Sequence, residues 1–312
     1  MAERLIGVDV GGTKVSVAGM RGGTLEEPAL QPTDTSSADA LLDQLTARIK
    51  AAGEAAAVGV AIPSIMDWEA GAARFSVNVP LQGVPVRDIL RERLGVPVYV
   101  DNDATCAGLA EAYDDDSRLL YRDLVAFTVG TGVGGGVVIG GRVHRGASGA
   151  AGELGHMIIG LDAAHDVPPA RVFPQRGSLE SLAAGRTLDA MALQHGLRDG
   201  PETVKRAQGG DSEAIRLITL LGRRLGLGIA NMINALDPEV VVIGGGVSAA
   251  GDLLIGPATE VARAYTITGG GTKTEIRRAR YGRTAGVRGA ALLAGLELAH
   301  DRGDDATEVL TG

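Results

Sequence analysis

The feature that most restricts the fold is a pair of apolar runs separated by glycines. Val125–Val129 leads into Gly130-Thr131-Gly132, and a second run at Val137–Ile139 follows the glycine-rich stretch. β-Branched runs on both sides of a glycine turn are typical of a β-hairpin. Glycine is unfavourable in strands, so several at one tip indicate that another group approaches the backbone closely. The turn is either purely structural, or its amides and the Thr131 hydroxyl bind phosphate oxygens.

The same arrangement occurs near the start of the chain. Leu5–Val10 meets Gly11-Gly12-Thr13-Lys14, and Val15–Met20 continues in β-prone residues. This recurrence predicts two related α/β halves. Asp9 stands at the end of the first run, where a carboxylate is costly unless it is solvated, hydrogen-bonded or close to a cation. It is a candidate for holding hydrated Mg²⁺, and the alternative is a structural acid of the turn.

Apolar runs of strand length alternate with segments of helical periodicity. Ala38–Ala52 and Val86–Leu94 have apolar residues at helical spacing, whereas Val58–Ile62 and Pro97–Val100 are short and continuous. Asp211–Leu236 carries a longer helical pattern. This alternation predicts an α/β fold with parallel strands.

Polar residues gather where predicted strands end. Asp101-Asn102-Asp103-Ala104 follows Pro97–Val100 and opens the helical run Thr105–Tyr113. The carboxyl ends of parallel strands are where open α/β sheets bind ligands, and two acids with an amide exceed the needs of a helix cap. Asn78 follows another turn, where it either bonds the turn backbone or contacts a ligand.

A third glycine turn and two further polar residues complete the set of candidate ligand-binding residues. Val240–Ile243 leads into Gly244-Gly245-Gly246, which is either a tight connection or a surface for a flat base or ribose. Glu153 and His156 follow the central hairpin in a region otherwise poor in polar groups. We expect a phosphate and a hydroxylated substrate to meet there.

Length and composition predict two domains. A chain of 312 residues with 45% hydrophobic content can bury two cores. We expect a smaller N-terminal α/β domain at 1–117 and a larger C-terminal α/β domain at 118–300. The helix predicted at about 284–299 could pack back on the first domain, and the polar tail at 301–312 is expected to be disordered.

Charge and cysteine content restrict the kinds of partner and metal site that we expect. The net charge of −8 without a basic stripe argues against nucleic acid as the main partner. The single cysteine, Cys106, excludes an intramolecular disulfide and a cysteine zinc cluster, and we expect it to be a small buried hydrophobe. A signal peptide and a long apolar span are not evident, so we expect a soluble, cytoplasmic protein that does not bind membranes.

Five segments together resemble the ROK family of bacterial sugar kinases and repressors, from Leu5 to about Leu298. They are D-V-G-G-T-K at Asp9, D-N-D-A at Asp101, G-T-G-V-G-G-G at Gly130, G-E-L-G-H at Gly152 and D-P-E-V-V-V-I-G-G-G-V-S at Asp237. The resemblance implies the actin-like ATPase (ribonuclease H-like) fold, with two α/β domains around a central cleft that closes over ATP and sugar. It also implies a homodimer.

Carried over by position, the resemblance implies a role for each candidate residue. Asp103 becomes the catalytic base. The residues expected to contact the sugar are Asn78, Asn102, Asp103, Glu153, His156 and Glu180. Those expected to face ATP and its Mg²⁺ are Asp9, Gly11, Gly12, Thr13, Lys14, Thr131 and Gly132 at the phosphates, with Gly244, Gly245 and Gly246 near the adenosine.

One departure from the family pattern concerns zinc. Many ROK proteins bind a structural zinc through three cysteines and the histidine of the E-x-G-H segment. This chain has Arg171, Phe173 and Ser178 at the cysteine positions. We therefore expect no zinc, and we expect the loop at 160–180 to be held by packing around Phe173 and the prolines.

The resemblance implies ATP-dependent phosphorylation of a hexose or amino-hexose at the 6-hydroxyl, as in a glucokinase. Glucose is the first expectation, with mannose, fructose, N-acetylated sugars and kanosamine-type amino sugars as alternatives. A non-catalytic sugar sensor is a second class, although the three glycine turns and Asp103 count against it. A DNA-binding repressor is disfavoured, because the first glycine turn begins at Asp9 and leaves no room for a preceding helix-turn-helix.

Overall fold

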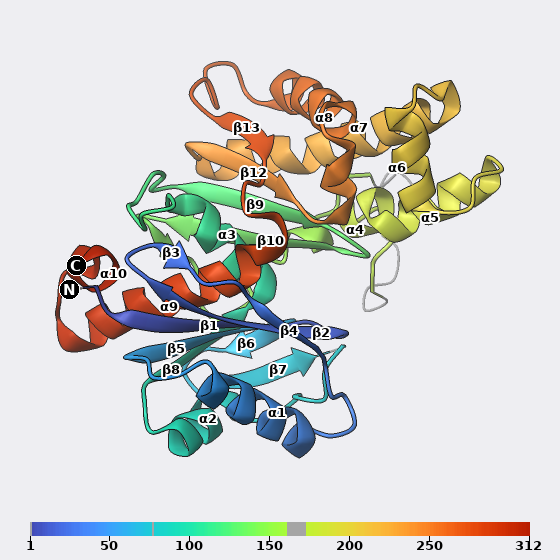
Figure 1. Ribbon diagram of the computed structural model, residues 1–312. Helices are drawn as coiled ribbons and strands as arrows, with labels where there is room; N and C mark the ends of the chain where they lie inside the picture. The colour runs from blue at the N-terminus through green and yellow to red at the C-terminus, as the bar shows by residue number, and fades with distance from the viewer. Residues whose placement is uncertain (1, 77, 161–172) are drawn as a thin grey trace. The chain divides into compact units, whose positions relative to one another are not determined.

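A computed structural model describes residues 2–76, 78–160 and 173–312 (Figure 1). The chain divides into two compact units, and the predicted boundary at residue 117 does not match their limits. Unit 1 comprises Met1–Arg122, Gly136–Gly152 and Arg280–Gly312, and unit 2 comprises Asp123–Gly135 and Glu153–Ala279. Each unit is discontinuous in sequence because strand β10 (Val133–Ile139) spans one boundary and the C-terminal helices belong to unit 1.

Unit 1 contains a mixed sheet with the strand order β3-β2-β1-β5-β8, and β4 also pairs with β2. These strands are β1 (Arg4–Val10), β2 (Lys14–Arg21), β3 (Thr24–Leu25), β4 (Ala29–Pro32), β5 (Ala57–Ile62) and β8 (Val98–Asn102). β1 runs antiparallel to β2 and parallel to β5, which is parallel to β8. The carboxyl ends of β1, β5 and β8 therefore lie at one edge of this sheet.

Helices cover both faces of this sheet (Figure 1): α1 (Ala38–Ala51) and α2 (Val86–Leu94) on one face and α9 (Ala285–Arg302) on the other. Ile6 and Val8 belong to the core beneath α1 and α2. Gly7 points the other way because side chains alternate along a strand. A methyl group on Gly7 would lie 1.9 Å from the Val287 carbonyl oxygen of α9. The sheet thus accepts the α9 backbone at very close range.

Unit 1 also contains elements that the sequence did not predict. Strands β6 (Ser64–Asp67) and β7 (Ala72–Ser76) form a separate hairpin. The tail predicted to be disordered contains helix α10 (Ala306–Thr311), whose Leu310 is only 2% exposed. The Glu3 backbone N–H donates to the Val309 carbonyl at 3.2 Å. The prediction of disorder was wrong because two apolar residues in a polar tail suffice to pack this short helix. The remaining elements of unit 1 are α3 (Asp103–Ala112), β11 (Arg142–Val143) and η3 (Gly282–Thr284).

A second mixed sheet has the order β11-β10-β9-β12-β13, in which β9 (Leu124–Val129), β12 (Val240–Gly244) and β13 (Glu275–Arg278) are parallel. In unit 2 the long helix α7 (Ser212–Leu236) packs against α8 (Asp252–Tyr265) and α6 (Gly200–Gln208). The shorter helices are η1 (Leu154–His156), α4 (Leu179–Ala183), α5 (Gly185–Gln194) and η2 (Gly246–Ala250).

The glycines between Gly130 and Gly136 lie partly in a turn and partly in a strand. Strand β10 begins at Val133, so only Gly130–Gly132 form the turn, and the following glycines lie within the strand. A methyl group on Gly136 would lie 2.9 Å from Thr105 Cα, at the start of α3. The glycine at this position therefore lets α3 pack directly on β10.

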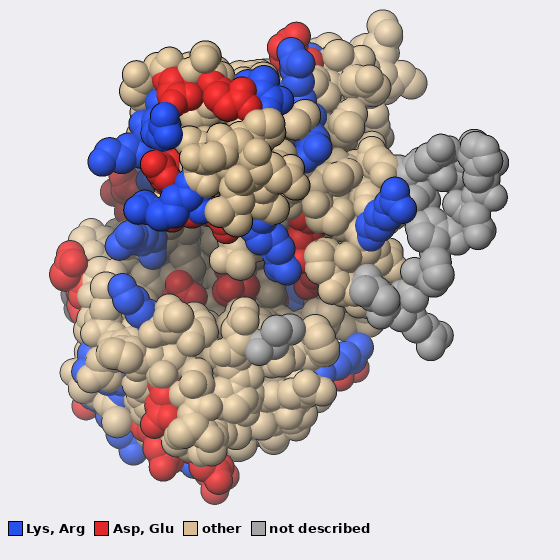
Figure 2. All heavy atoms as spheres, turned by 90° about the vertical axis from the view of Figure 1, so that its right-hand side faces the viewer, with Lys and Arg blue, Asp and Glu red and all other residues tan. Residues whose placement is uncertain are grey.

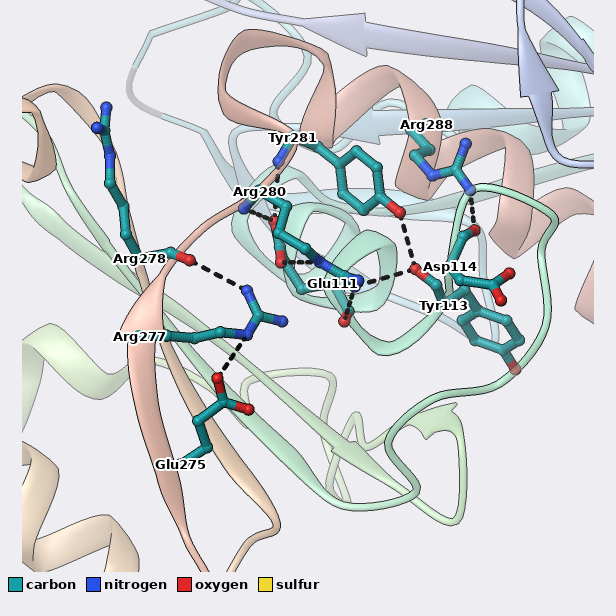
Figure 3. Close-up of polar contacts among 9 residues, drawn as sticks. All are labelled: Glu111, Tyr113, Asp114, Glu275, Arg277, Arg278, Arg280, Tyr281 and Arg288. Atoms are coloured by element: carbon teal, nitrogen blue, oxygen red, sulfur yellow. Dashed lines mark hydrogen bonds and ion pairs between the residues drawn. The ribbon is translucent and has the colours of Figure 1, made fainter.

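A buried acid anchors the chain where it returns to unit 1 after β13 (Figure 3). Glu111 of α3 is 1% exposed. Its Oε1 accepts hydrogen bonds from the backbone N–H groups of Arg280 (2.6 Å) and Tyr281 (3.1 Å). Arg280 Nε also donates to Glu111 Oε2 at 3.3 Å, and Arg280 Nη2 donates to the Glu111 carbonyl at 2.8 Å. The chain leading into α9 is thus bound to the C-terminal part of α3.

Charged side chains of both signs are interleaved on the face drawn in Figure 2. Exposed charges also pair along helices, as Arg216 does with Glu213 at 2.6 Å in helix α7. Among the described residues, every helix is too short or too polar to cross a membrane.

Candidate functional site

Asp103 is the first residue of α3, directly after β8. The Asn102 side chain caps this helix by accepting a hydrogen bond from the Thr105 N–H at 3.0 Å. Asp103 Oδ1 accepts from the Ala104 N–H at 2.8 Å. Burial raises the pKa of Asp103 above its ordinary value, and hydrogen bonds from the Ala104 and Asp103 N–H groups oppose that rise. The carboxyl is therefore positioned at a helix N-terminus with increased basicity.

Asp9 belongs to the same unit, near the end of β1. Helix α9 closes over it, since a methyl group on Gly286 would lie 2.4 Å from Asp9 Oδ2. Burial raises the pKa of Asp9 to about 7, and the negative charge of Asp103 adds to the rise. Two carboxylates with mutual repulsion suit a site that receives a proton or a hard cation such as Mg²⁺.

The first glycine turn connects β1 to β2. The Gly11 N–H donates to the Lys14 carbonyl at 2.9 Å, and the Thr33 hydroxyl donates to the Gly11 carbonyl at 2.6 Å. Thr13 and Lys14 are exposed. A methyl group on Gly12 would lie 3.0 Å from Asn78 Cβ, so the predicted residue Asn78 lies beside this turn.

The second glycine turn, Gly130–Gly132, is held by residues of α4 and α5 within unit 2. The Val133 N–H donates to Glu180 Oε2 at 2.9 Å, and Arg186 Nε donates to the Thr131 carbonyl at 3.1 Å. Arg186 Nη2 also pairs with Glu180 Oε1 at 3.3 Å. A methyl group on Gly132 would lie 2.4 Å from Glu180 Oε2. The predicted residues Thr131, Gly132 and Glu180 thus form one cluster.

The third glycine turn lies beside the second. Gly244 pairs with Thr128 of β9. A methyl group on Gly245 would lie 2.4 Å from the Val129 carbonyl oxygen, and the φ of 83° at Gly245 favours glycine. Gly246 opens η2. Unit 2 therefore brings two backbone turns together at the ends of adjacent parallel strands, as ligand sites of α/β sheets require.

Glu153 directly precedes η1, His156 is its last residue, and the two side chains form a pair. Glu153 Oε2 lies 3.6 Å from His156 Nε2, and both side chains are partly exposed. The Phe173 ring contacts the His156 ring edge-on, with centroids 5.2 Å apart. The two polar groups remain accessible to a ligand.

The loop after His156 is joined at its two ends by backbone hydrogen bonds. Arg171 lies outside the described residues. Phe173 is 64% exposed and contacts the His156 ring, whereas the prolines at 168 and 169 lie outside the described residues, so packing around Phe173 and the prolines stays a prediction. The Ile159 N–H donates to the Gly177 carbonyl and the Leu179 N–H donates to the Met157 carbonyl, both at 2.8 Å. Main-chain pairing thus provides restraint that side-chain patterns do not predict.

Cys106 is buried in α3, and burial raises the pKa of its thiol. In the part of the chain that the structure describes, His, Cys, Asp and Glu side chains form no group of three or more that could hold a metal ion.

Sequence reasoning missed Arg186. Its position offered a signal, because a cation in the first turn of a helix opposes the helix dipole and needs a partner. Asp101, Arg145 and Glu297 were also missed as a group, because they lie far apart in the sequence.

A mixed sheet flanked by helices in unit 1, together with a second mixed sheet and two paired glycine turns, defines the actin-like ATPase class of fold. The ROK family model matches residues 5–296, and the chain therefore belongs to the ROK family.

Relatives and solved structures match this chain over nearly its whole length. The chain is 31% identical to a glucokinase of Halalkalibacterium halodurans, covering 94% of this chain and 96% of the relative. It is 34% identical to an N-acetyl-D-glucosamine kinase of Shigella flexneri serotype 5b, covering 92% and 98%. The structure of a ROK hexokinase from Thermus thermophilus matches with a TM-score of 0.82, 36% identity and coverage of 95% and 99%. A ROK family glucokinase from Streptomyces griseus in complex with glucose and AMPPNP matches with a TM-score of 0.75, 28% identity and coverage of 93% and 99%.

Proposed function

We propose that this protein transfers the γ-phosphoryl group of ATP to a hydroxyl group of a hexose or amino-hexose, at the 6-position. The observation that carries the proposal is the carboxyl of Asp103, fixed at the start of α3 with a raised pKa. Membership of the ROK family and similarity to sugar kinases of two specificities support it.

In the proposed reaction the sugar hydroxyl oxygen attacks the γ-phosphorus. The new oxygen–phosphorus bond forms, the bond from the γ-phosphorus to the bridging oxygen breaks, and ADP leaves. Phosphoryl transfer needs alignment, charge neutralisation and a proton acceptor more than covalent help. Asp103 accepts the hydroxyl proton, and its raised pKa suits a general base.

The phosphate-binding groups are backbone amides and a cation. We assign Gly11, Gly12, Thr13 and Lys14 of the first turn, with Thr131 and Gly132 of the second, to the ATP phosphates. Mg²⁺ accompanies ATP and supplies positive charge to the phosphate oxygens. Asp9 would hold it, because a cation there offsets the effects of burial and of the nearby Asp103 charge, which together raise the pKa of Asp9 to about 7. Gly244, Gly245 and Gly246 are assigned to the adenosine.

The sugar-binding groups are assigned as Asn78, Asn102, Glu153, His156 and Glu180. Carboxylates accept hydrogen bonds from sugar hydroxyls, and amide and imidazole groups can both accept and donate them, which fixes the hydroxyls in place. Glucose is the substrate that we propose first. An N-acetylated or kanosamine-type amino sugar is the alternative substrate for the same phosphoryl transfer. The partly exposed pair of Glu153 and His156 supports a polar sugar contact in unit 2.

The test is a panel of glucose, mannose, fructose, N-acetylglucosamine and kanosamine with Mg²⁺ and ATP. ADP formation gives the rate, and phosphorus NMR of the product gives the phosphorylated position. We expect one sugar to be phosphorylated at the 6-hydroxyl well above the others. Sugar binding without ADP formation would instead support a non-catalytic sensor. A homodimer stays a prediction, which sedimentation velocity would measure.

A further inference from the structure

The carboxylate of Asp101 has no part in the proposed chemistry, yet it is almost completely buried, at 5% exposure. Its Oδ2 accepts a 2.7 Å hydrogen bond from Arg145 Nε. Its Oδ1 accepts a 2.8 Å hydrogen bond from the backbone N–H of Asn102. Burial raises the pKa of Asp101, and the charge of Arg145 lowers it. A carboxylate buried in this way stays ionised only if a cation lies beside it.

Arg145 connects Asp101 to two other elements of unit 1. Its Nη2 donates to Glu297 Oε1 of α9 at 2.9 Å. Its guanidinium carbon lies 3.4 Å from the centre of the Trp68 ring, in the turn of the β6–β7 hairpin. A planar guanidinium can bind two acids and stack on an aromatic ring at the same time, which an ammonium group cannot do equally well. The end of β8, helix α9 and the hairpin are thereby held by one side chain.

The residues that Asp101 restrains lead directly to Asp103. Asp101 fixes the peptide N–H of Asn102, and Asn102 uses Oδ1 to cap α3. Asn102 Nδ2 donates to the Ser64 carbonyl of the hairpin at 3.2 Å. The backbone that sets the direction of the Asp103 side chain is therefore held by Asp101 and, through the Asn102 side chain, by the hairpin.

We propose that Arg145 is a positioning residue for the general base, acting through Asp101 on the Asn102–Asp103 backbone. The inference rests on the proposed function. Buried ion networks are often neutral or costly for stability compared with apolar replacements. A contribution to folding stability therefore does not by itself account for the network, whereas a need to hold Asp103 in line does. A misplacement of about 1 Å in a reacting group can cost about 100-fold in rate.

The experiment compares Arg145→Met with a matched control, Arg142→Met. Arg142 also pairs with Glu297, at 3.3 Å, but its side chain is 44% exposed, and the hydrogen bonds to the Asp101 carboxylate come from Arg145 and the Asn102 N–H. For Arg145→Met we expect kcat to fall by about 100-fold with little change in the KM for ATP. For Arg142→Met we expect kcat close to wild type. Arg145→Lys should lie between them, because it restores the charge without the planar fork.

Two further measurements keep a positioning role distinct from a structural one. Thermal unfolding of each variant shows whether the protein is folded at the assay temperature. Asp101→Asn keeps the shape of the side chain but weakens the bond to Arg145, and it should also lower kcat without raising the KM for ATP. Full kcat in folded Arg145→Met, or an equal loss in Arg142→Met, would reject the positioning role.

The proposed function has its own control in the same assay. If Asp103→Asn is inactive while Arg145→Met turns over normally, only the inference about Arg145 fails. If Asp103→Asn retains turnover, the assignment of the general base fails, and the role of Arg145 fails with it.

Discussion

Glu180 accepts a 2.9 Å hydrogen bond from the Val133 backbone N–H, which places a carboxylate against the glycine turn that we assign to phosphate. The same carboxylate pairs with Arg186, whose Nε donates to the Thr131 carbonyl. The turn thus takes its shape from side chains of α4 and α5. A carboxylate can accept several hydrogen bonds, so a sugar contact at Glu180 remains compatible with these bonds.

Replacing Glu180 by Ala should raise the KM for ATP and the KM for sugar together. The reason is that the turn and the sugar contact depend on one carboxylate. Loss of a hydrogen bond to a charged group corresponds to about tenfold in affinity or more. Steady-state kinetics with each substrate varied in turn measures both effects.

Arg186→Met is the matched variant, because Arg186 contacts the turn and Glu180 but is not assigned to sugar. It should raise only the KM for ATP. An unchanged KM for ATP in both variants would contradict the role of this cluster in shaping the phosphate turn.

Asp103→Asn should lower kcat by about 10²–10⁴ while ATP affinity stays near wild type, because general-base catalysis contributes about that much. The wild-type pH profile gives an independent measure. The base must be deprotonated, and burial raises the pKa of Asp103, so kcat/KM should rise with pH through a value above that of an ordinary aspartate. Calorimetric titration with ATP and a pH series of initial rates check the two points. An acid limb at the ordinary aspartate pKa would contradict the assignment.

Asp9→Asn should change how stability depends on pH. The folded protein raises the pKa of Asp9 from 3.8 to about 7, so it binds the proton more tightly than the unfolded chain does. The contribution of Asp9 to the unfolding free energy is therefore greatest below pH 3.8 and is lost as pH rises towards about 7. Relative to wild type, Asp9→Asn should gain stability over that window and retain the gain at pH 8. Urea unfolding of both proteins across pH measures the difference.

Mg²⁺ provides the control for the Asp9 prediction. A cation bound at Asp9 offsets the buried charge, so it should stabilise wild type at pH 8 more than it stabilises Asp9→Asn. If the unfolding free energies of wild type and Asp9→Asn differ by the same amount at every pH, Asp9 does not titrate in this range.

Arg280→Met should destabilise the protein by about 2 kcal/mol, because Glu111 loses the hydrogen bonds of the guanidinium but keeps those from the Arg280 and Tyr281 N–H groups. Glu111 is 1% exposed, and Arg280 contacts its side chain and its carbonyl (Figure 3). Arg278→Met is the control, since Arg278 is exposed and such changes stay within about 0.5 kcal/mol. Chemical denaturation of the two variants should separate them clearly, and equal stabilities would contradict the anchoring role of Glu111.

The sequence by itself predicted the elements whose signals are local. The apolar runs before Gly11, Gly130 and Gly244 predicted β1, β9 and β12, and helical spacing predicted α1, α2 and α7. The ROK resemblance rested on the same short segments, and the family match over residues 5–296 confirmed it. These features depend on neighbouring residues, so one stretch of chain suffices to predict them.

The tertiary structure decided the features that join distant residues. Asp101, Arg145 and Glu297 form one ion network, although nothing in the local sequence around any of them indicates the other two. Glu180 was predicted from family resemblance to contact sugar, and only the fold brought it to the Val133 N–H. Helix α10 required a surface on which to bury Leu310. Pairing and burial of this kind depend on which strands and helices pack together, and the choice of packing partner leaves no periodic pattern in the sequence.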